Sequence, residues 1–396
     1  MTSSTASVGA LPPLTADESA QETRLLARIR AEIERNGGWL SFERFMEMAL
    51  YEPGLGYYSA GARKLGRDGD FVTAPEISAL FSRCLARQCA QILTALGGGD
   101  VLELGAGSGA MAADMLLELA AMDVLPRRYL ILEVGADLRE RQRATIQARA
   151  PQLFDRVSWL DALPENLCGV IVANEVLDAL PVQRFCMRGS GVQALGVSFQ
   201  NDRLELSVAP ADDLLTGAVR AIEQTIGREL PDGYCSEVNI RLQPWLRGVA
   251  SSLQSGAMIF IDYGLPRAQY YSGERSDGTL LCHFRHRAHD DALLHVGLQD
   301  IGAWVDFTAV AEAAVECECS VLGYTTQAHF LMSCGIESLL GDFAEQDATT
   351  RIQLAQQTRT LLLPGEMGER FKVIALGKDW SEPLLGFAMR DLAATL

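Results

Sequence analysis

The chain has 396 residues, of which 48% are hydrophobic, so it can bury a sizeable core and is not expected to be disordered as a whole. Its 51 acidic and 34 basic residues give a net charge of −17. That balance argues against a nucleic-acid-binding protein, because neutralising phosphates requires a clustered excess of Lys and Arg. No apolar run approaches the roughly 20 residues of a membrane-spanning helix, so no membrane span is expected.

The nine cysteines are scattered and include no Cys-x-x-Cys pair, which predicts free thiols in a reducing cytoplasm rather than a zinc or thioredoxin-type site. Cys317 and Cys319 lie two apart in an expected strand, so we expect a buried pair of free thiols there. The first 23 residues carry no Lys or Arg, unlike a secretory signal or an Arg-rich transit peptide. Residues 1–20 are therefore predicted to be a disordered tail of a cytoplasmic protein.

The N-terminal section, residues 21–77, is predicted to hold helices and a functional loop. Apolar residues at helical spacing predict a helix from Ala16 to Asn36, and Ser41 is expected to cap a second helix. The Gly-rich and aromatic segment from Tyr51 to Glu76 has neither helical nor strand period, and long loops of this kind are usually functional or disordered. We expect an ordered functional loop there, followed by a helix from about Ser78 to Leu96.

Short apolar segments then alternate with helical ones, which predicts an α/β fold with a mostly parallel sheet and right-handed crossovers. This core is assigned to residues 78–180 and 233–265. The expected strands are Asp100 to Leu104, Tyr129 to Val134, Val157 to Leu160, Gly169 to Ala173 and Ala257 to Asp262. The expected helices include Ala110 to Met122, Ala136 to Ala150 and Trp245 to Leu253.

Three further segments differ from this rhythm. Residues 181–232 are predicted to be a β-rich insertion with a helix. Residues 266–314 are predicted to be substrate-side loops, and the spacing of His283, His286, His289 and His295 does not match a metal motif. His283 or His286 is instead expected to contact substrate. Residues 315–396 are predicted to complete the core with strands at Val315 to Leu322 and Phe371 to Leu376.

A glycine turn closes the first core strand. Gly105, Gly107 and Gly109 allow the backbone to turn sharply and to approach a ligand with no Cβ in the way. Ala110 also completes the looser dinucleotide fingerprint, so the turn alone leaves the ligand open. Glu103 favours S-adenosylmethionine, because a carboxylate there would repel a pyrophosphate and suits the α-amino group of a methionine moiety.

Acidic residues follow the next strands. Glu133 ends the second strand, where a carboxylate can accept hydrogen bonds from both ribose hydroxyls. Asp161 follows the third strand and is placed to receive the adenine amino group, although a helix cap or a solvated loop acid explains it equally well.

The loop from Asn174 to Pro181 follows the fourth strand and carries Glu175 and Asp178. Paired acids can hold a guanidinium in bidentate fashion and aim one nitrogen at a sulfonium methyl group. They can also stabilise the charge that localises during transfer. Asp262, at the end of the fifth strand, is expected either to assist as a third acid or to hold the loop by hydrogen bonds.

Further motifs accompany these acids over nearly the whole chain. They include Leu50-Tyr-x-Pro53, Gly56-Tyr-Tyr58, Gly69-Asp-Phe-x-Thr73, Pro75-Glu76, Ala173-Asn-Glu-x-Leu-Asp-Ala-Leu-Pro181, Ser236-Glu237, Ile261-Asp-Tyr-Gly264 and Glu366-Met-Gly-x-x-Phe371. This ordered set resembles the MidA-like methyltransferases, the group that includes a mitochondrial complex I assembly factor that dimethylates an arginine. One departure is Asp300-Ile-Gly-Ala-Trp304, where the family usually has Asp-Ile-Thr-Ala-His.

The resemblance implies a class I methyltransferase (Rossmann-like) fold, with helices on both faces of the sheet and an N-terminal helical extension over the cofactor. The implied cofactor is S-adenosyl-L-methionine. The predicted cofactor-binding residues are Thr73, Pro75, Glu76, Glu103, Gly105, Ala106, Gly107, Gly109, Glu133, Asp161 and Asn174. The predicted catalytic residues are Glu175, Asp178 and Asp262.

These features predict a protein arginine N-methyltransferase acting on a complex I-type subunit or another protein. A methyltransferase for a small molecule or another nucleophile would have the same cofactor-binding motifs, so it remains an alternative. A non-catalytic assembly factor with a retained cofactor fold is a further alternative, and a nicotinamide-dependent oxidoreductase is the weakest. The expected partner is a protein substrate, with no nucleic acid, and homodimerisation is left open.

Overall fold

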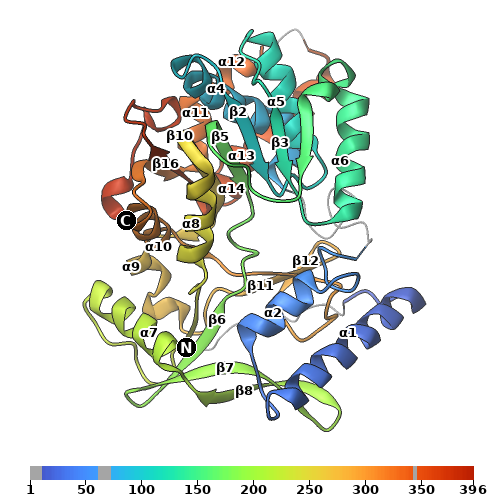
Figure 1. The fold of residues 1–396 in the computed structure, drawn as a ribbon, viewed down its shortest axis with the longest axis vertical. Coiled ribbons are helices and arrows are strands. Elements are labelled where there is room, and N and C mark those ends of the chain that lie inside the picture. Colours follow the sequence, from blue (N-terminus) through green and yellow to red (C-terminus); the bar gives the residue numbers. More distant parts are fainter. Residues whose placement is uncertain (1–10, 61–72, 342–345) are drawn as a thin grey trace. The chain divides into compact units, whose positions relative to one another are not determined.

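The structure is a computed structural model that describes residues 11–60, 73–341 and 346–396. The chain divides into two compact units (Figure 1). Unit 1 comprises residues 1–72, 179–240 and 271–303, and unit 2 comprises residues 73–178, 241–270 and 304–396. The N-terminal section, the insertion and the substrate-side loops of the sequence analysis therefore cluster together. The expected loop residues 61–72 lie outside the described part of the chain.

Unit 2 holds the predicted α/β sheet. Its strand order is β15-β16-β10-β5-β2-β3-β4, with β14 beside β10. The strands from β10 to β4 in this order are parallel, whereas β16 runs antiparallel to both β10 and β15. The strands are β2 (Asp100–Leu104), β3 (Tyr129–Leu132), β4 (Val157–Leu160), β5 (Leu167–Asn174), β10 (Leu253–Leu265), β14 (Val305–Asp306), β15 (Ser320–Thr326) and β16 (Phe371–Lys378).

Helices cover both faces of this sheet. Val101, Val172 and Ile259 point into a core shared with α4 and α5, whereas Phe260 on the opposite face meets Trp245 of α8. This arrangement confirms the predicted fold class. The helices are α3 (Ala74–Ile77), α4 (Ala79–Ala95), α5 (Ala110–Ala121), α6 (Ala136–Arg149), α8 (Leu242–Ser252), α9 (Arg267–Tyr270), α10 (Phe307–Glu316), α11 (Gln327–Ser333), α12 (Ile336–Leu339), α13 (Ala348–Leu362) and α14 (Met367–Arg370).

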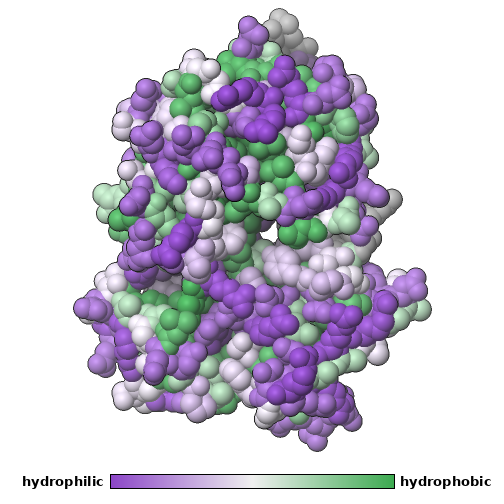
Figure 2. All heavy atoms as spheres, viewed as in Figure 1, coloured by the Kyte–Doolittle hydropathy of each residue, from purple (hydrophilic) through white to green (hydrophobic). Residues whose placement is uncertain are grey.

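The helix α6 shows how the sequence pattern sets burial. Only Leu138, Gln142 and Ile146, spaced by four residues, are buried. The remaining positions are mostly charged or polar, and Figure 2 shows hydrophilic side chains over this region of the surface. In the described part of the chain, every helix is too short or too polar to cross a bilayer.

Unit 1 is built from antiparallel strands and helices with a core of its own. Apolar residues of α1 and α2, among them Leu25, Ile29 and Phe45, pack with Val197 of β7. The sheet order is β1-β7-β6-β9, with β8 beside β7, and a smaller sheet has the order β12-β11-β13. The elements are α1 (Ala16–Arg35), β1 (Leu40–Ser41), α2 (Phe42–Tyr51), β6 (Gln183–Arg188), β7 (Gly191–Gln200), β8 (Arg203–Pro210), α7 (Asp213–Ile226), β9 (Cys235–Val238), β11 (Leu281–Phe284), β12 (Arg287–His289) and β13 (Asp300–Gly302).

A disulfide joins two neighbouring strands of unit 1 and corrects the expectation that the cysteines are free. Cys186 of β6 and Cys235 of β9 are direct cross-strand partners with Cα atoms 4.1 Å apart, and they are bonded. Sequence spacing could not show this pairing, because the two residues are 49 positions apart.

Two local predictions were also wrong. Residues 16–20 belong to α1 rather than to a tail, since Thr15 and Glu18 form a capping box. The strand expected from Val315 begins only at Ser320, because α10 continues through Glu316. Cys317 and Cys319 therefore lie in the turn between them, where Cys319 is buried and Cys317 is partly exposed.

Candidate active site

The glycine turn lies at the carboxyl end of β2, where unit 2 carries most of the predicted site. Gly105, Gly107 and Gly109 all have positive φ angles, of 65°, 54° and 85°. Such angles are readily accessible only to glycine. A Cβ on Gly109 would also lie 2.9 Å from Cα of Gln142, and Ala106 between the glycines is buried. The turn leads directly into α5, and the Gly105 and Gly109 N–H groups donate to the Leu132 and Ala106 carbonyls, at 3.0 and 2.8 Å. Three of its positions carry no side chain, so a ligand is predicted to contact its backbone.

The Glu133 carboxylate is held beside this turn by a residue that the sequence analysis missed. Glu133 accepts hydrogen bonds from the Gly135 N–H (2.9 Å) and from Gln142 Nε2 (3.0 Å). Gln142 Nε2 also donates to the Gly107 carbonyl, and its Oε1 accepts from Trp159 Nε1. Burial raises the pKa of Glu133, although these donors oppose the shift. Gln142 occupies the same buried face as Leu138 and Ile146, and a polar residue at such a position was the available signal.

Glu103 lies near the carboxyl end of β2. Its side chain is only 1% exposed, and its carboxylate accepts a hydrogen bond from the Tyr129 hydroxyl at 2.6 Å. Burial raises the pKa of Glu103 to about 7, while the Tyr129 hydroxyl acts in the opposite direction. The alternation of side chains along β2 explains this, because Glu103 shares the inward face of Val101. The contact of Glu103 with the cofactor's amino group stays a prediction.

The residues of α3 reach the same turn. Thr73 is the N-cap of this short helix and Pro75 lies in its first turn. Glu76 accepts a hydrogen bond from the Ser108 hydroxyl, within the glycine turn. This contact brings Glu76 to the glycine turn, and the roles of Thr73 and Pro75 toward the cofactor stay predictions.

Asp161 follows β4 and is largely exposed. Its carboxylate pairs with Arg139 Nη1 at 2.7 Å, and its side chain is 92% exposed. Arg139 also donates to the carbonyls of Glu133 and Leu160, so it ties the ends of β3 and β4 together. The role of Asp161 toward adenine stays a prediction.

The loop after β5 begins with a strained residue. Glu175 has a φ of 55°, a left-handed conformation that non-glycine residues adopt at a cost and that is common at functional sites. Its N–H donates to the Ile261 carbonyl at 2.9 Å, and its carboxylate accepts from Asn174 Nδ2 at 3.0 Å. Glu175 remains partly exposed, whereas Asn174 and Asp178 are buried. A Cβ on Gly105 would lie 3.1 Å from Val176, so this loop contacts the glycine turn.

Asp262 binds the backbone of this loop through its carboxylate. Its side chain has no exposed surface, and Oδ2 accepts from the N–H groups of Leu177 and Asp178 at 2.9 and 3.2 Å. Oδ1 accepts from the Tyr263 N–H. Burial raises the pKa of Asp262 well above its usual value, and the charges of Asp178 and Glu175 add to this effect. These bonds agree with the loop-holding role, and the role of Asp262 as a third acid stays a prediction.

The predicted histidines lie in unit 1. His283 is on β11, where burial lowers its pKa, and His286 follows in the turn before β12. Within residues 11–60, 73–341 and 346–396, no cluster of His, Cys, Asp or Glu is large enough to hold a metal ion. A contact of His283 or His286 with substrate stays a prediction.

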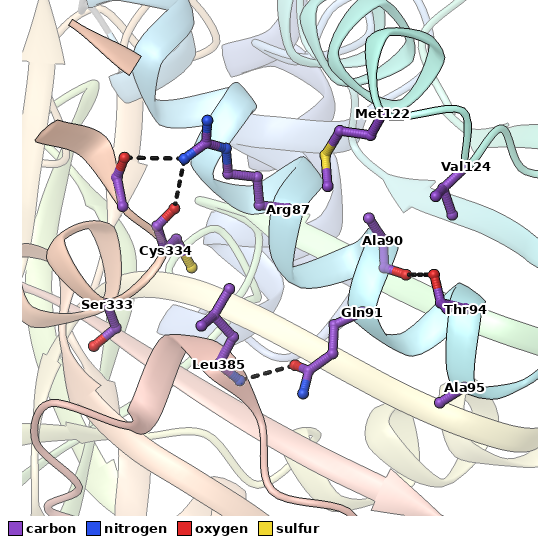
Figure 3. A pocket seen from close by; sticks show the side chains of 11 residues that line it. Arg87, Ala90, Gln91, Thr94, Ala95, Met122, Val124, Ser333, Cys334 and Leu385 are labelled. Carbon is purple, nitrogen blue, oxygen red and sulfur yellow. Dashed lines mark hydrogen bonds between the residues drawn. The ribbon is translucent and has the colours of Figure 1, made fainter. Parts of the chain in front are cut away.

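A hollow of about 710 Å³ lies elsewhere in unit 2, at the C-terminal end of α4 (Figure 3). Its lining includes Met122, Val124 and Leu385, and the Leu385 N–H donates to Gln91 Oε1 at 2.8 Å. The glycine turn meets the opposite, N-terminal end of the neighbouring helix α5. This hollow is therefore separate from the predicted cofactor pocket.

The architecture and the site define a class of enzyme. A mostly parallel sheet with a glycine turn after β2 and an acid after β3 is the arrangement of S-adenosylmethionine-dependent methyltransferases, and this chain is one of them. A family model described as S-adenosyl-L-methionine-dependent methyltransferase matches residues 84–325, so the chain belongs to that family.

Solved and curated relatives agree with this assignment. A COG1565 superfamily member from Burkholderia thailandensis, solved with bound S-adenosyl-homocysteine, is 43% identical. The match covers 98% of this chain and 100% of that one, with a TM-score of 0.92. The protein arginine methyltransferase NDUFAF7, mitochondrial, of Danio rerio is 28% identical over 86% of this chain and 83% of its own length. The human protein of that name is 28% identical over 89% and 83%.

Proposed function

We propose that the chain is a protein arginine N-methyltransferase, with a complex I-type subunit or another protein as its methyl acceptor. The observation that carries this proposal is the pair Glu175 and Asp178, held in one loop against the glycine turn. The names of the Danio rerio and human relatives, which include protein arginine methyltransferase, support it.

The residues present fit the cofactor. S-adenosylmethionine supplies an electrophilic methyl group on a sulfonium. Gly105, Gly107 and Gly109 would hold its methionine end and Glu133 its ribose, with Ala106 in the turn between the glycines. Thr73, Pro75 and Glu76 would border the pocket, and Asn174 lies at the end of the central strand β5.

The acids would act on the acceptor. Two carboxylates can bind the edge of a planar guanidinium and fix its orientation, so that one nitrogen lone pair points toward the transferred methyl group. Glu175 is partly exposed and would make the principal contact, and Asp178 the second. Asp262 would position both indirectly, because it fixes the backbone of Leu177 and Asp178.

Labelled cofactor tests the proposal. Purified protein and tritiated S-adenosylmethionine would be added to an extract of cells that lack the gene, and methylarginine would be located by mass spectrometry. We expect Glu175→Gln to lower transfer about 100-fold, the usual effect of removing one such electrostatic contact, while S-adenosyl-homocysteine binding is retained. Glu337→Gln, an exposed acid on α12, is the matched control. Transfer to a small molecule instead of protein would refute the arginine assignment, and absence of any transfer would favour a non-catalytic assembly factor.

The cellular location and the oligomeric state remain part of the proposal. The cysteines and the N-terminal composition predicted a cytoplasmic protein, whereas the relatives' names include the word mitochondrial. Fractionation of the source cells decides the first point, and light scattering decides between a monomer and a homodimer.

A further inference from the structure

Three aromatic side chains of unit 2 meet at the carboxyl edge of its sheet. Tyr263 follows Asp262 near the end of β10, Phe371 begins β16, and Trp304 precedes β14. The Tyr263 ring makes edge contacts with Trp304 (centroids 6.4 Å apart, 78°) and with Phe371 (5.6 Å, 76°). We call this group the aromatic wall.

The aromatic wall stands on the same side of the sheet as Asn174, the first residue of the loop at 174–181 that we call the acid loop. Side chains alternate along β10, so Tyr263 shares the face of Ile261 rather than that of Asp262. Ile261 is the register partner of Asn174, and its carbonyl accepts the Glu175 N–H. Tyr263 therefore lies two residues, about 7 Å along the strand, beyond the point where Glu175 is attached. An aromatic side chain spans much of that distance.

The aromatic wall is more than an extension of the core. Phe371 packs against the core cluster of unit 2, but Tyr263 and Trp304 are not among the side chains of that cluster. All three residues are partly exposed.

Aromatic faces and carboxylates bind complementary parts of a guanidinium. The carboxylates bind its N–H edge, whereas an aromatic ring attracts its planar face, and tryptophan does so most strongly. An ammonium group is compact and strongly hydrated, so it gains less from such stacking.

We propose that the aromatic wall is a subsite for the planar cation of the acceptor side chain. The guanidinium stacks on Trp304 while Glu175 binds its edge, and this selects arginine over lysine. The inference rests on the proposed function, since it assumes an arginine acceptor, but its test measures binding and not transfer.

The probe is Nα-acetyl-arginine amide, titrated into the full chain saturated with S-adenosyl-homocysteine. The five tryptophan indole N–H signals are followed by NMR, and Trp304 is assigned from Trp304→Phe. We expect the Trp304 signal to shift with the arginine derivative, but not with the neutral citrulline analogue or with Nα-acetyl-lysine amide. Trp304→Ala is expected to weaken arginine binding at least fivefold, with S-adenosyl-homocysteine affinity unchanged.

Trp380→Ala is the matched control, because this partly buried tryptophan lies beyond the other end of β16, roughly 25 Å along the strand from Phe371. Equal affinity of Trp304→Ala and wild type, or equal binding of the citrulline analogue, overturns the proposal. If Trp304→Ala does not fold, Trp304→His replaces it. Its arginine affinity is expected to fall from pH 8 to pH 6, as the imidazole gains a repelling charge, and a pH-independent affinity equal to wild type refutes the subsite. If the arginine derivative binds the aromatic wall but no methyl transfer occurs, the proposed function is refuted and the subsite is not.

Discussion

Gln142 shows how one side chain can organise several parts of a binding edge. Its amide joins the Glu133 carboxylate, the Gly107 carbonyl and the Trp159 indole. Because Gln142 is fully buried, the loss of either end of the amide leaves a buried polar group without its partner.

We expect Gln142→Met to lower S-adenosyl-homocysteine affinity about tenfold, which corresponds to ~1.4 kcal/mol. The reason is that the Glu133 carboxylate loses one of the donors that fix its position. Isothermal titration measures the change. Gln91→Met, in the separate hollow, is the control and should leave affinity unaltered. An effect below twofold for Gln142→Met would show that Glu133 is held well enough by Gly135 alone.

Glu103 gives a prediction about pH. Its pKa rises from 4.5 to about 7 in the folded chain, so the folded state binds this proton more tightly than the unfolded state. The contribution of Glu103 to stability is therefore complete below pH 4.5 and is lost as the pH rises toward 7. Glu103→Gln keeps the shape but cannot ionise. Relative to wild type, the free energy of unfolding of this variant should increase by about 2–3 kcal/mol between pH 5 and pH 8.

Urea unfolding at both pH values measures this gain. The exposed control Glu337→Gln should change stability by less than about 0.5 kcal/mol at either pH. A gain for Glu103→Gln that is the same at pH 5 and pH 8 would contradict the assignment of the raised pKa to this residue.

At the scale of elements, the antiparallel strands of unit 1 depend on contacts between residues distant in sequence. The disulfide between β6 and β9 closes a segment that contains β7, β8 and α7. Cross-linking restricts the unfolded chain more strongly as the closed segment lengthens.

We expect Cys186→Ser to lower the melting temperature measured without reductant. The loop-entropy model gives a loss of roughly 4 kcal/mol as an upper estimate for a segment of this length. Dithiothreitol should lower the melting temperature of wild type toward that of the variant and should leave the melting temperature of the variant unchanged. Cys168→Ser, which changes a partly exposed free thiol, is the control. Alkylation of both Cys186 and Cys235 in the untreated native protein would refute the bond.

At the scale of the molecule, the two units have separate hydrophobic cores, and the residues predicted to bind the cofactor all belong to unit 2. A ligand that binds only the folded state stabilises the part of the chain that carries its site.

Calorimetry should therefore resolve two unfolding transitions. S-adenosyl-homocysteine should raise the midpoint temperature of one of them. At a concentration 100 times its Kd, the expected stabilisation is about 2.7 kcal/mol. Cys186→Ser should lower the other transition, which identifies it as unit 1. A single transition that responds to both changes would show that the units unfold together.

Local patterns predicted most of the fold. The strands of the parallel sheet were found because they are buried on both faces and alternate with helices. The glycine turn was found because glycine adopts positive φ angles far more readily than other residues. The strand expected at Val315 failed because α10 continues through a short apolar run that suits either state. The disulfide could not be predicted, since the pairing of β6 with β9 is a tertiary property.

The site was predicted less completely than the fold. Glu133, Glu175 and Asp178 follow strands at the carboxyl edge of the sheet, as the sequence pattern predicted. The hydrogen bond from Tyr129 to Glu103 was not predicted, because it joins two strands whose pairing is a tertiary property. Gln142 was missed because its partners come from three different elements. The aromatic wall combines residues from three separate strand ends, which the sheet brings together only after folding.

The close approach of Gly105 to Val176 has a consequence for redirecting this enzyme to new acceptors. A Cβ at Gly105 would lie 3.1 Å from the Val176 side chain. A larger side chain at residue 176, introduced to reshape the predicted acceptor side, would therefore press on the glycine turn, where the cofactor is predicted to bind. Libraries that vary the acid loop would need cofactor affinity as a parallel selection, because variants with a better acceptor fit can lose the methyl donor.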